Sequence, residues 1–187
     1  MTAFVHIIRS LALAATILVN AGLAIAAEKA PGEYEVKAAF VYNFFTFVEW
    51  PPQTIAQADA IKVCLLGKLP NRDAFDELNG QDAMGKKLTV IRITSQADAG
   101  KCQILFIGPS EERELPRIVK SLQGTGTLTI GDTAGFARQG VVINFYLEDR
   151  KVRFEINTAA ARRAGLTISS KLLKLAGAVY GGSQAGD

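Results

Sequence analysis

Two cysteines, Cys64 and Cys102, are the side chains with the clearest chemical potential, and they are the only cysteines of the chain. Each lies in a compact apolar run, Ile61–Gly67 or Cys102–Gly108, typical of buried strands that are near neighbours in a parallel sheet. In an exported chain such a pair indicates a disulfide, worth about 4 kcal/mol in the chain-entropy model. A redox-sensing pair is the alternative, but no Cys-x-x-Cys motif supports it.

Histidine chemistry is excluded from most of the chain, because its only histidine is His6. Residues 28–187 therefore cannot use a Ser-His-Asp or Cys-His arrangement, histidine-based proton transfer or a histidine-containing zinc site. The carboxylates show no pairing that would justify a hydrolase, so we expect no catalytic residue, metal or cofactor. The acidic residues considered are Glu33, Glu35, Glu49, Asp59, Asp132, Glu148, Asp149 and Glu155.

The first residues have the pattern of a secretory signal peptide. Met1–Ser10 carries one cation, Arg9, and no acid, and the apolar run Leu11–Ile25 precedes an Ala-x-Ala site that ends at Ala26. We expect a signal peptide over residues 1–26, with cleavage after Ala26 or after Ala27. An uncleaved anchor is the alternative, although the run is short for a membrane span. Either reading places the rest of the chain outside the cytoplasm, in the periplasm.

The composition indicates one ordinary globular domain. The formal net charge is only +3, which is too small to argue for nucleic acid as a partner. Residues 159–179 superficially resemble a helix-turn-helix, but the charged Lys171 falls where the second helix should be apolar. We therefore expect a folded domain over residues 33–180, a tail over residues 181–187 and no nucleic-acid binding.

A long helix is predicted from Glu33 to Trp50, ended by two prolines. Its apolar residues run nearly all round, so the helix is buried on most sides. Its aromatic cluster is either core or a surface for a dimer or another partner. We expect Tyr42, Phe47 and Trp50 at that surface, with Trp50 at an exposed helix end.

Further strands alternate with short helices through the first two-thirds of the chain. Gly67, Gly108 and Asp132 each directly follow a strand, the place where α/β sheets often bind ligands. These three residues form a candidate ligand site. Capping of a helix is the alternative role of Asp132.

The last third contains a hairpin and two helices. Val141–Leu147 and Lys151–Ile156 alternate in polarity, with Arg153 and Glu155 on the outer side of the second strand. Asn157 is expected to cap a helix over Thr158–Ala164, and Ser169 is expected to cap one over Ser170–Tyr180. The predicted fold is a single α/β domain, with a mostly parallel sheet flanked by helices and a C-terminal antiparallel hairpin.

Five blocks of the chain, in this order, resemble the YfiR family. They are VKAAFVYNFFTFVEWPP (Val36–Pro52), IKVCLLG (Ile61–Gly67), CQILFIG (Cys102–Gly108), LTIGDTAGFARQGVVINF (Leu128–Phe145) and VRFEINTAAARRAGLTISSKLLKLA (Val152–Ala176). The resemblance covers about residues 33 to 180. It implies an α/β protein that dimerises and carries a disulfide, with Cys64 and Cys102 matching the cysteine pair of the family. A second cysteine pair found in some relatives is absent here, as is the usual Gly-Gly at Gln139-Gly140.

The resemblance also implies a function, that of a periplasmic regulator rather than an enzyme. The family is best known for binding the periplasmic sensor domain of an inner-membrane diguanylate cyclase and holding the cyclase inactive, which restrains biofilm formation. For this role we expect contacts from the Tyr42–Trp50 segment and from Arg153 and Glu155. The alternative is a periplasmic module that binds a small ligand near Gly67, Gly108 and Asp132 and has no cyclase partner.

Overall fold

A computed structural model describes residues 30–181 of the chain. The expected signal peptide, residues 1–26, lies outside the described residues, as does all but the first residue of the expected tail. Residues 31–187 form a unit of their own, and its described part is the subject below. Within residues 30–181, no helix combines the length and the apolarity that crossing a membrane requires.

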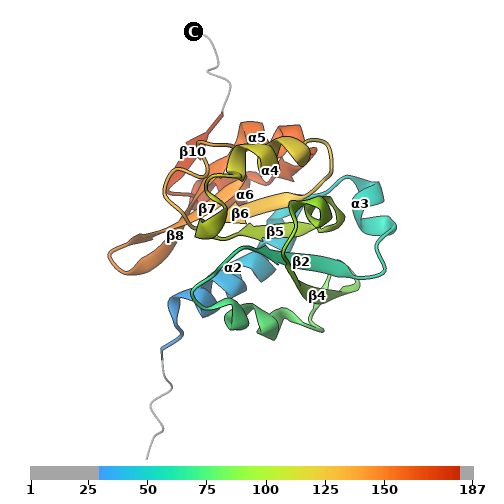
Figure 1. Cartoon of the computed structure of the whole chain (residues 1–187), viewed down its shortest axis with the longest axis horizontal. Coiled ribbons are helices and arrows are strands. Elements are labelled where there is room, and N and C mark those ends of the chain that lie inside the picture. The colour runs from blue at the N-terminus through green and yellow to red at the C-terminus, as the bar shows by residue number, and fades with distance from the viewer. Residues whose placement is uncertain (1–29, 182–187) are drawn as a thin grey trace, which may run out of the picture. The chain divides into compact units, whose positions relative to one another are not determined.

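An eight-stranded mixed sheet runs through this unit, in the spatial order β10–β8–β7–β6–β5–β2–β4–β3 (Figure 1). Its strands are β2 (Ile61–Leu66), β3 (Asp82–Ala83), β4 (Lys86–Ile93), β5 (Ile104–Ile107), β6 (Leu128–Gly131), β7 (Ile143–Glu148), β8 (Lys151–Asn157) and β10 (Ala178–Tyr180). A second, two-stranded sheet pairs β1 (Val48–Glu49) with β9 (Thr167–Ile168).

The sheet has the mostly parallel character that the sequence predicts. Neighbouring strands from β4 through β2, β5 and β6 to β7 are parallel, whereas the β7–β8 hairpin is antiparallel and β10 returns parallel to β8. All residues of β5 and β6 are buried, as expected for parallel strands covered on both faces. The predicted α/β class and the C-terminal hairpin are therefore confirmed.

Helices cover the sheet on both faces. On one face α2 (Glu33–Phe47) packs in the larger core, together with Val63 and Leu65 of β2. On the other face α4 (Leu115–Ser121) packs with Cys64 and Leu66, because alternate residues of a strand point to opposite faces (Figure 1). The remaining helices are α3 (Pro52–Ala56), α5 (Thr158–Ala164), α6 (Ser170–Leu175) and the 3-10 helices η2 (Arg72–Leu78), η3 (Gln96–Lys101) and η4 (Pro109–Glu111).

The contact between α2 and the sheet consists largely of phenylalanine rings. Phe44 stacks on Phe145 with the ring centroids 5.9 Å apart and meets Phe154 edge-on at 5.5 Å. Phe40, one turn before Phe44 on the helix, packs against the same two rings. Most of the aromatic cluster therefore belongs to the core, which is one of the two interpretations that the sequence allows.

The predicted helix over Glu33–Trp50 ends three residues early, at Phe47. Val48 and Glu49 are extended and pair with Thr167 and Ile168 of β9. Two forces explain the difference: residues before a proline avoid the helical conformation, and β9 offers a hydrogen-bonding partner. The amide of Ser169 also donates to the carbonyl of Phe47 at 2.9 Å.

The predicted helix over Ser170–Tyr180 is also too long, since α6 ends at Leu175 and Ala178–Tyr180 forms the edge strand β10. The amide of Gly177 donates to the carbonyl of Phe154, which starts the pairing with β8. Gly177 lies so close to Tyr146 that a Cβ atom would overlap the phenol oxygen. The residue that separates α6 from β10 is therefore in contact with a side chain that is distant in sequence.

Both predicted helix caps are present. The Asn157 side chain accepts a hydrogen bond from the amide of Ala160 at 2.8 Å and donates to the carbonyl of Ala137 at 2.7 Å. The hydroxyl of Ser169 accepts from the amide of Leu172 at 3.2 Å. The Asn157 side chain therefore joins β8, α5 and the loop before β7, whereas the Ser169 side chain caps α6 alone.

We expect Asn157→Ala to lower the free energy of unfolding by about 2 kcal/mol. The substitution removes the side-chain amide that caps α5 and that also donates to the carbonyl of Ala137. Ser169→Ala is the matched control and should cost about 1 kcal/mol, since it removes only a cap. Urea denaturation followed by circular dichroism measures both values. Equal losses for the two variants would contradict the assignment of two separate roles to Asn157.

Candidate functional site

Cys64 and Cys102 form a disulfide, with the Cα atoms 6.0 Å apart. Cys64 lies within β2, and Cys102 lies after η3, separated from β5 by Gln103. The bond therefore ties β2 to the segment that leads into its parallel neighbour β5. Both residues are buried in the core on the α4 face. This burial limits the access of a thiol to either sulfur and suits a structural bridge.

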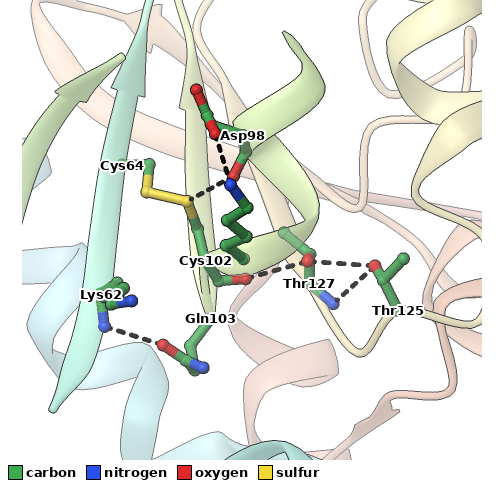
Figure 2. The surroundings of a disulfide bond; sticks show 8 residues. Lys62, Cys64, Asp98, Cys102, Gln103, Thr125 and Thr127 are labelled. Carbon is green, nitrogen blue, oxygen red and sulfur yellow. Dashed lines mark hydrogen bonds and ion pairs between the residues drawn. A yellow bond between two sulfur atoms is a disulfide. The ribbon is translucent and has the colours of Figure 1, made fainter. Parts of the chain in front are cut away.

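Polar side chains hold the start of β5 around the disulfide (Figure 2). The Thr127 hydroxyl donates to the carbonyl of Cys102 at 2.9 Å, and Gln103 accepts from the amide of Lys62 at 2.8 Å. The ammonium of Lys101 is paired with Asp98 at 2.8 Å. The cation next in sequence to Cys102 is thus already paired with a carboxylate.

A buried ion pair lies at the carboxyl end of β6. The carboxylate of Asp132 accepts hydrogen bonds from the Lys37 ammonium at 2.9 Å and the Tyr34 phenol at 2.6 Å. The side chains of Lys37 and Asp132 are only 4% and 5% exposed. Glu33, one turn before Lys37 on α2, forms a second ion pair with the same ammonium. Tyr34 and Lys37 therefore join α2 to the sheet through Asp132, and Glu33 adds an ion pair within the helix.

Tyr34 remains a hydrogen-bond donor in this cluster. Burial, followed by the hydrogen bond to Asp132 and its negative charge, raises the pKa of the phenol well above its ordinary range. The Lys37 ammonium also lies 4.3 Å from the centre of the Tyr34 ring, a cation–π contact.

The expectation that Asp132 caps a helix is wrong, because its carboxylate is taken up by side chains of α2. Both contacts use Oδ2 of Asp132, and its place in a ligand site stays a prediction. The sequence analysis missed Lys37 altogether. The signal was present, since Lys37 is the only basic residue in α2, a helix that is apolar nearly all round.

The other two residues of the expected ligand site, Gly67 and Gly108, lie at the carboxyl ends of β2 and β5, which are neighbours in the sheet. A Cβ atom at Gly108 would lie 2.6 Å from the carbonyl oxygen of Lys68, and Ser110 accepts from the Lys68 amide at 2.9 Å. The loops after the two strands therefore contact one another directly. A cavity of about 430 Å³ remains beside Gly67.

The aromatic residues expected at a partner surface differ in exposure. Trp50 is only 7% exposed, stacks on Phe45 and donates through Nε1 to the carbonyl of Gln103 at 3.3 Å. Its expected place at an exposed helix end is thus wrong, because the chain turns into β1 before reaching it. Tyr42 and Phe47 are half-buried, and the Tyr42 phenol donates to the carbonyl of Asp82.

Arg153 and Glu155 lie on the outer face of the hairpin, as predicted. Arg153 is 3.3 Å from Glu148 across the two strands, and both side chains are about half exposed. Glu155 accepts hydrogen bonds from Asn144 at 3.2 Å and from the Tyr180 phenol at 2.8 Å. We call this surface the hairpin face; its residues are Tyr146, Glu148, Lys151, Arg153 and Glu155.

The expected partner residues do not form one continuous surface. Phe154 faces α2, so its neighbours Arg153 and Glu155 point to the opposite side of the sheet. Tyr42 and Phe47, on α2, belong to the other side. Arg153 and Glu155 therefore share one face, and the α2 residues are separate from it.

The described residues hold no group of three or more His, Cys, Asp or Glu side chains able to bind a metal ion. The buried polar cluster at Asp132 lacks a nucleophile with an adjacent base, since its groups are an ion pair and a protonated phenol. The arrangement orients α2 and offers no obvious acid–base chemistry.

The model of the YfiR/HmsC-like family matches residues 34–177. The chain belongs to this family. The match includes both cysteines, the Lys37–Asp132 pair and the whole hairpin. Membership of the family supports, at the level of class, a regulatory role in cyclic di-GMP signalling.

Two solved structures are similar to the chain at 12% sequence identity. A conserved domain protein of Vibrio cholerae has a TM-score of 0.49, with 79% of this chain and 60% of that one covered. An ABC domain of Streptococcus pneumoniae, solved in complex with L-Trp, has a TM-score of 0.47, with 68% and 57% covered. The chain thus spans less than two thirds of the length of each solved chain.

Replacing both cysteines, Cys64→Ala with Cys102→Ala, should lower the free energy of unfolding by about 4 kcal/mol, because the bond closes a loop between residues 38 apart. Chemical denaturation with and without reductant measures the change. Reductant should destabilise the wild-type protein and leave the double variant unaffected. Coinciding transitions for the oxidised wild type and the variant would contradict a stabilising bridge.

Removing either Lys37 or Asp132 from the buried ion pair should destabilise the fold. We expect Lys37→Met and Asp132→Asn each to lower the free energy of unfolding by about 3 kcal/mol. Each change removes one member of the ion pair and leaves the other buried without it. The combined variant should lose less than the sum of the two, and urea denaturation gives all three values. Lys87→Met, which breaks the exposed pair with Asp82, is the matched control and should cost less than about 1 kcal/mol. Strictly additive losses would show that Lys37 and Asp132 are not coupled.

Proposed function

We propose that this protein is a periplasmic regulator that binds the sensor domain of an inner-membrane diguanylate cyclase and holds the cyclase inactive. Such binding would keep cyclic di-GMP low and restrain biofilm formation. The observation that carries the proposal is the family match over residues 34–177. The apolar N-terminal run and the buried disulfide support a place outside the cytoplasm.

Inhibition of this kind requires no catalytic group in the regulator. A protein that binds the inactive state of the cyclase more tightly than the active state shifts the equilibrium by that difference in affinity. A rigid surface is therefore the main requirement. The disulfide and the buried Lys37–Asp132 pair supply rigidity to the sheet and to α2.

We assign the contact with the cyclase to the hairpin face. Its strands end in a two-residue turn, at Asp149 and Arg150, that projects beyond the neighbouring elements (Figure 1). Arg153 and Glu148 present opposite charges that are about half exposed, and Tyr146, which is opposite Arg153 in the hairpin, is half-buried. Exposed charges beside an aromatic side chain suit specific recognition of another protein.

We assign the homodimer that the family resemblance implies to the separate α2 side, where Tyr42 and Phe47 are half-buried. Trp50 then acts indirectly, by holding the segment after α2 against Gln103. Two different surfaces would let the protein dimerise and bind the cyclase at the same time.

Charge reversal by Arg153→Glu should abolish cyclase inhibition without unfolding the protein, because an exposed ion pair contributes less than about 1 kcal/mol. In a deletion strain that expresses each variant, we expect cyclic di-GMP to rise several-fold with Arg153→Glu and to stay low with the wild type. Lys171→Glu reverses an exposed charge on α6 and is the matched control. Unchanged inhibition by a folded Arg153→Glu protein would remove the hairpin face from the proposal.

Crosslinking in the periplasm tests the partner itself. The tagged protein should co-purify with a diguanylate cyclase from the inner membrane, and Arg153→Glu should lose it. Recovery of this protein alone, from a strain that expresses such cyclases, would favour the second candidate. That candidate is a periplasmic module for a small ligand at the cavity beside Gly67, and it involves no cyclase.

A further inference from the structure

A second cavity, of about 420 Å³, lies at the opposite ends of the strands. Residues of α4 and α5 form its walls, and Thr127, Thr129 and Val142, at the amino ends of β6 and β7, form its floor. Its volume is within the range of small-molecule sites, about 300 to 1,000 Å³. It contains none of the residues assigned above to the cyclase contact or to the strand-end site.

The charged residues of this cavity all have one sign. Lys120 of α4 and Arg163 of α5 line it, and no acidic residue among the described ones does. Within residues 30–181, neither cation forms an ion pair with a carboxylate. The cavity therefore offers two positive charges that the protein itself does not neutralise.

The floor adds a hydroxyl donor. Thr129 is 4% exposed, and its Oγ1 accepts a hydrogen bond from the amide of Val142 at 2.9 Å. The hydroxyl proton of Thr129 is donated to no acceptor in the described part of the chain. A buried donor of this kind gains free energy from a ligand oxygen, because an unsatisfied buried polar group is unfavourable.

The rest of the lining is mixed, with the amide side chains of Gln123 and Gln139 beside apolar residues. Val119, Leu122 and Ala160 contribute aliphatic surface beside the polar groups. A ligand that suits this lining has a negatively charged group, within reach of ammonium, guanidinium and hydroxyl donors, and an apolar body.

We propose that the cavity between α4 and α5 binds a small organic anion, a carboxylate with an apolar body. The carboxylate contacts Lys120, Arg163 and Thr129, and the apolar part packs on Val119 and Leu122. The site is independent of the cyclase proposal, because it uses none of the same residues.

The cavity beside Gly67 suits such a ligand less well. Its Arg92 is held by Asp73 at 3.0 Å and Asp76 at 2.7 Å, and its Glu111 accepts from Ser110 at 2.8 Å. Lys68 and Arg72 also line this cavity, and Arg72 lies 3.9 Å from Asp73, so two of its three cations are paired with carboxylates. Its lining also includes the carboxylate of Glu111. An organic anion should prefer the cavity between α4 and α5.

The test is a titration of the purified chain, without its first 26 residues, with phenylbutyrate and with the neutral phenylbutyramide. Backbone amide NMR signals report where each probe binds. We expect saturable shifts at Gly140, Ala160 and their neighbours with phenylbutyrate, and at least tenfold weaker binding of the amide. The variant Lys120→Gln with Arg163→Gln should bind phenylbutyrate at least tenfold more weakly.

Arg162→Gln is the matched control, because Arg162 is the next residue on α5 but donates to the carbonyl of Gly181. It should bind phenylbutyrate like the wild type, and thermal melting of each variant shows whether the fold is retained. The proposal is overturned if phenylbutyrate gives no saturable shifts. It is also overturned if the shifts map to Gly67, if the amide binds equally well, or if the folded double variant keeps its affinity.

Discussion

The helix α2 contacts the sheet mainly through phenylalanine rings, and rings alone allow several rotations of the helix about its axis. Lys37 removes this freedom, because a buried ammonium must meet a carboxylate, and Asp132 is the one that it meets on the sheet. With that pair formed, Phe44 reaches Phe145 and Phe154, and the chain after Phe47 arrives beside β9.

Much of the fold could be predicted from local pattern. The runs around Cys64 and Cys102 are short, apolar and bounded by glycine, and the hairpin alternates strictly, so their strands were found. The short strands β1 and β10 were not found, because two or three residues carry no periodicity. They exist through partners distant in sequence, at Thr167 for β1 and at Glu155 for β10.

The candidate sites were predicted less completely, for a related reason. The disulfide could be predicted because only one pairing exists, and the outward side of Arg153 follows from a period of two. The partners of Asp132 could not, since Tyr34 and Lys37 lie almost a hundred residues earlier in the chain. The cavity between α4 and α5 was missed because its cations come from two helices that the sequence does not relate.

The two cysteines also simplify how the chain matures. Two thiols allow a single disulfide, so oxidation cannot produce a wrong pairing, and an oxidant alone suffices without an isomerase. The bond joins strands that already share hydrogen bonds, so it closes on a geometry the sheet itself provides. With both sulfurs in use, no thiol remains to link two copies, and any dimer is held by non-covalent contacts that dilution can reverse.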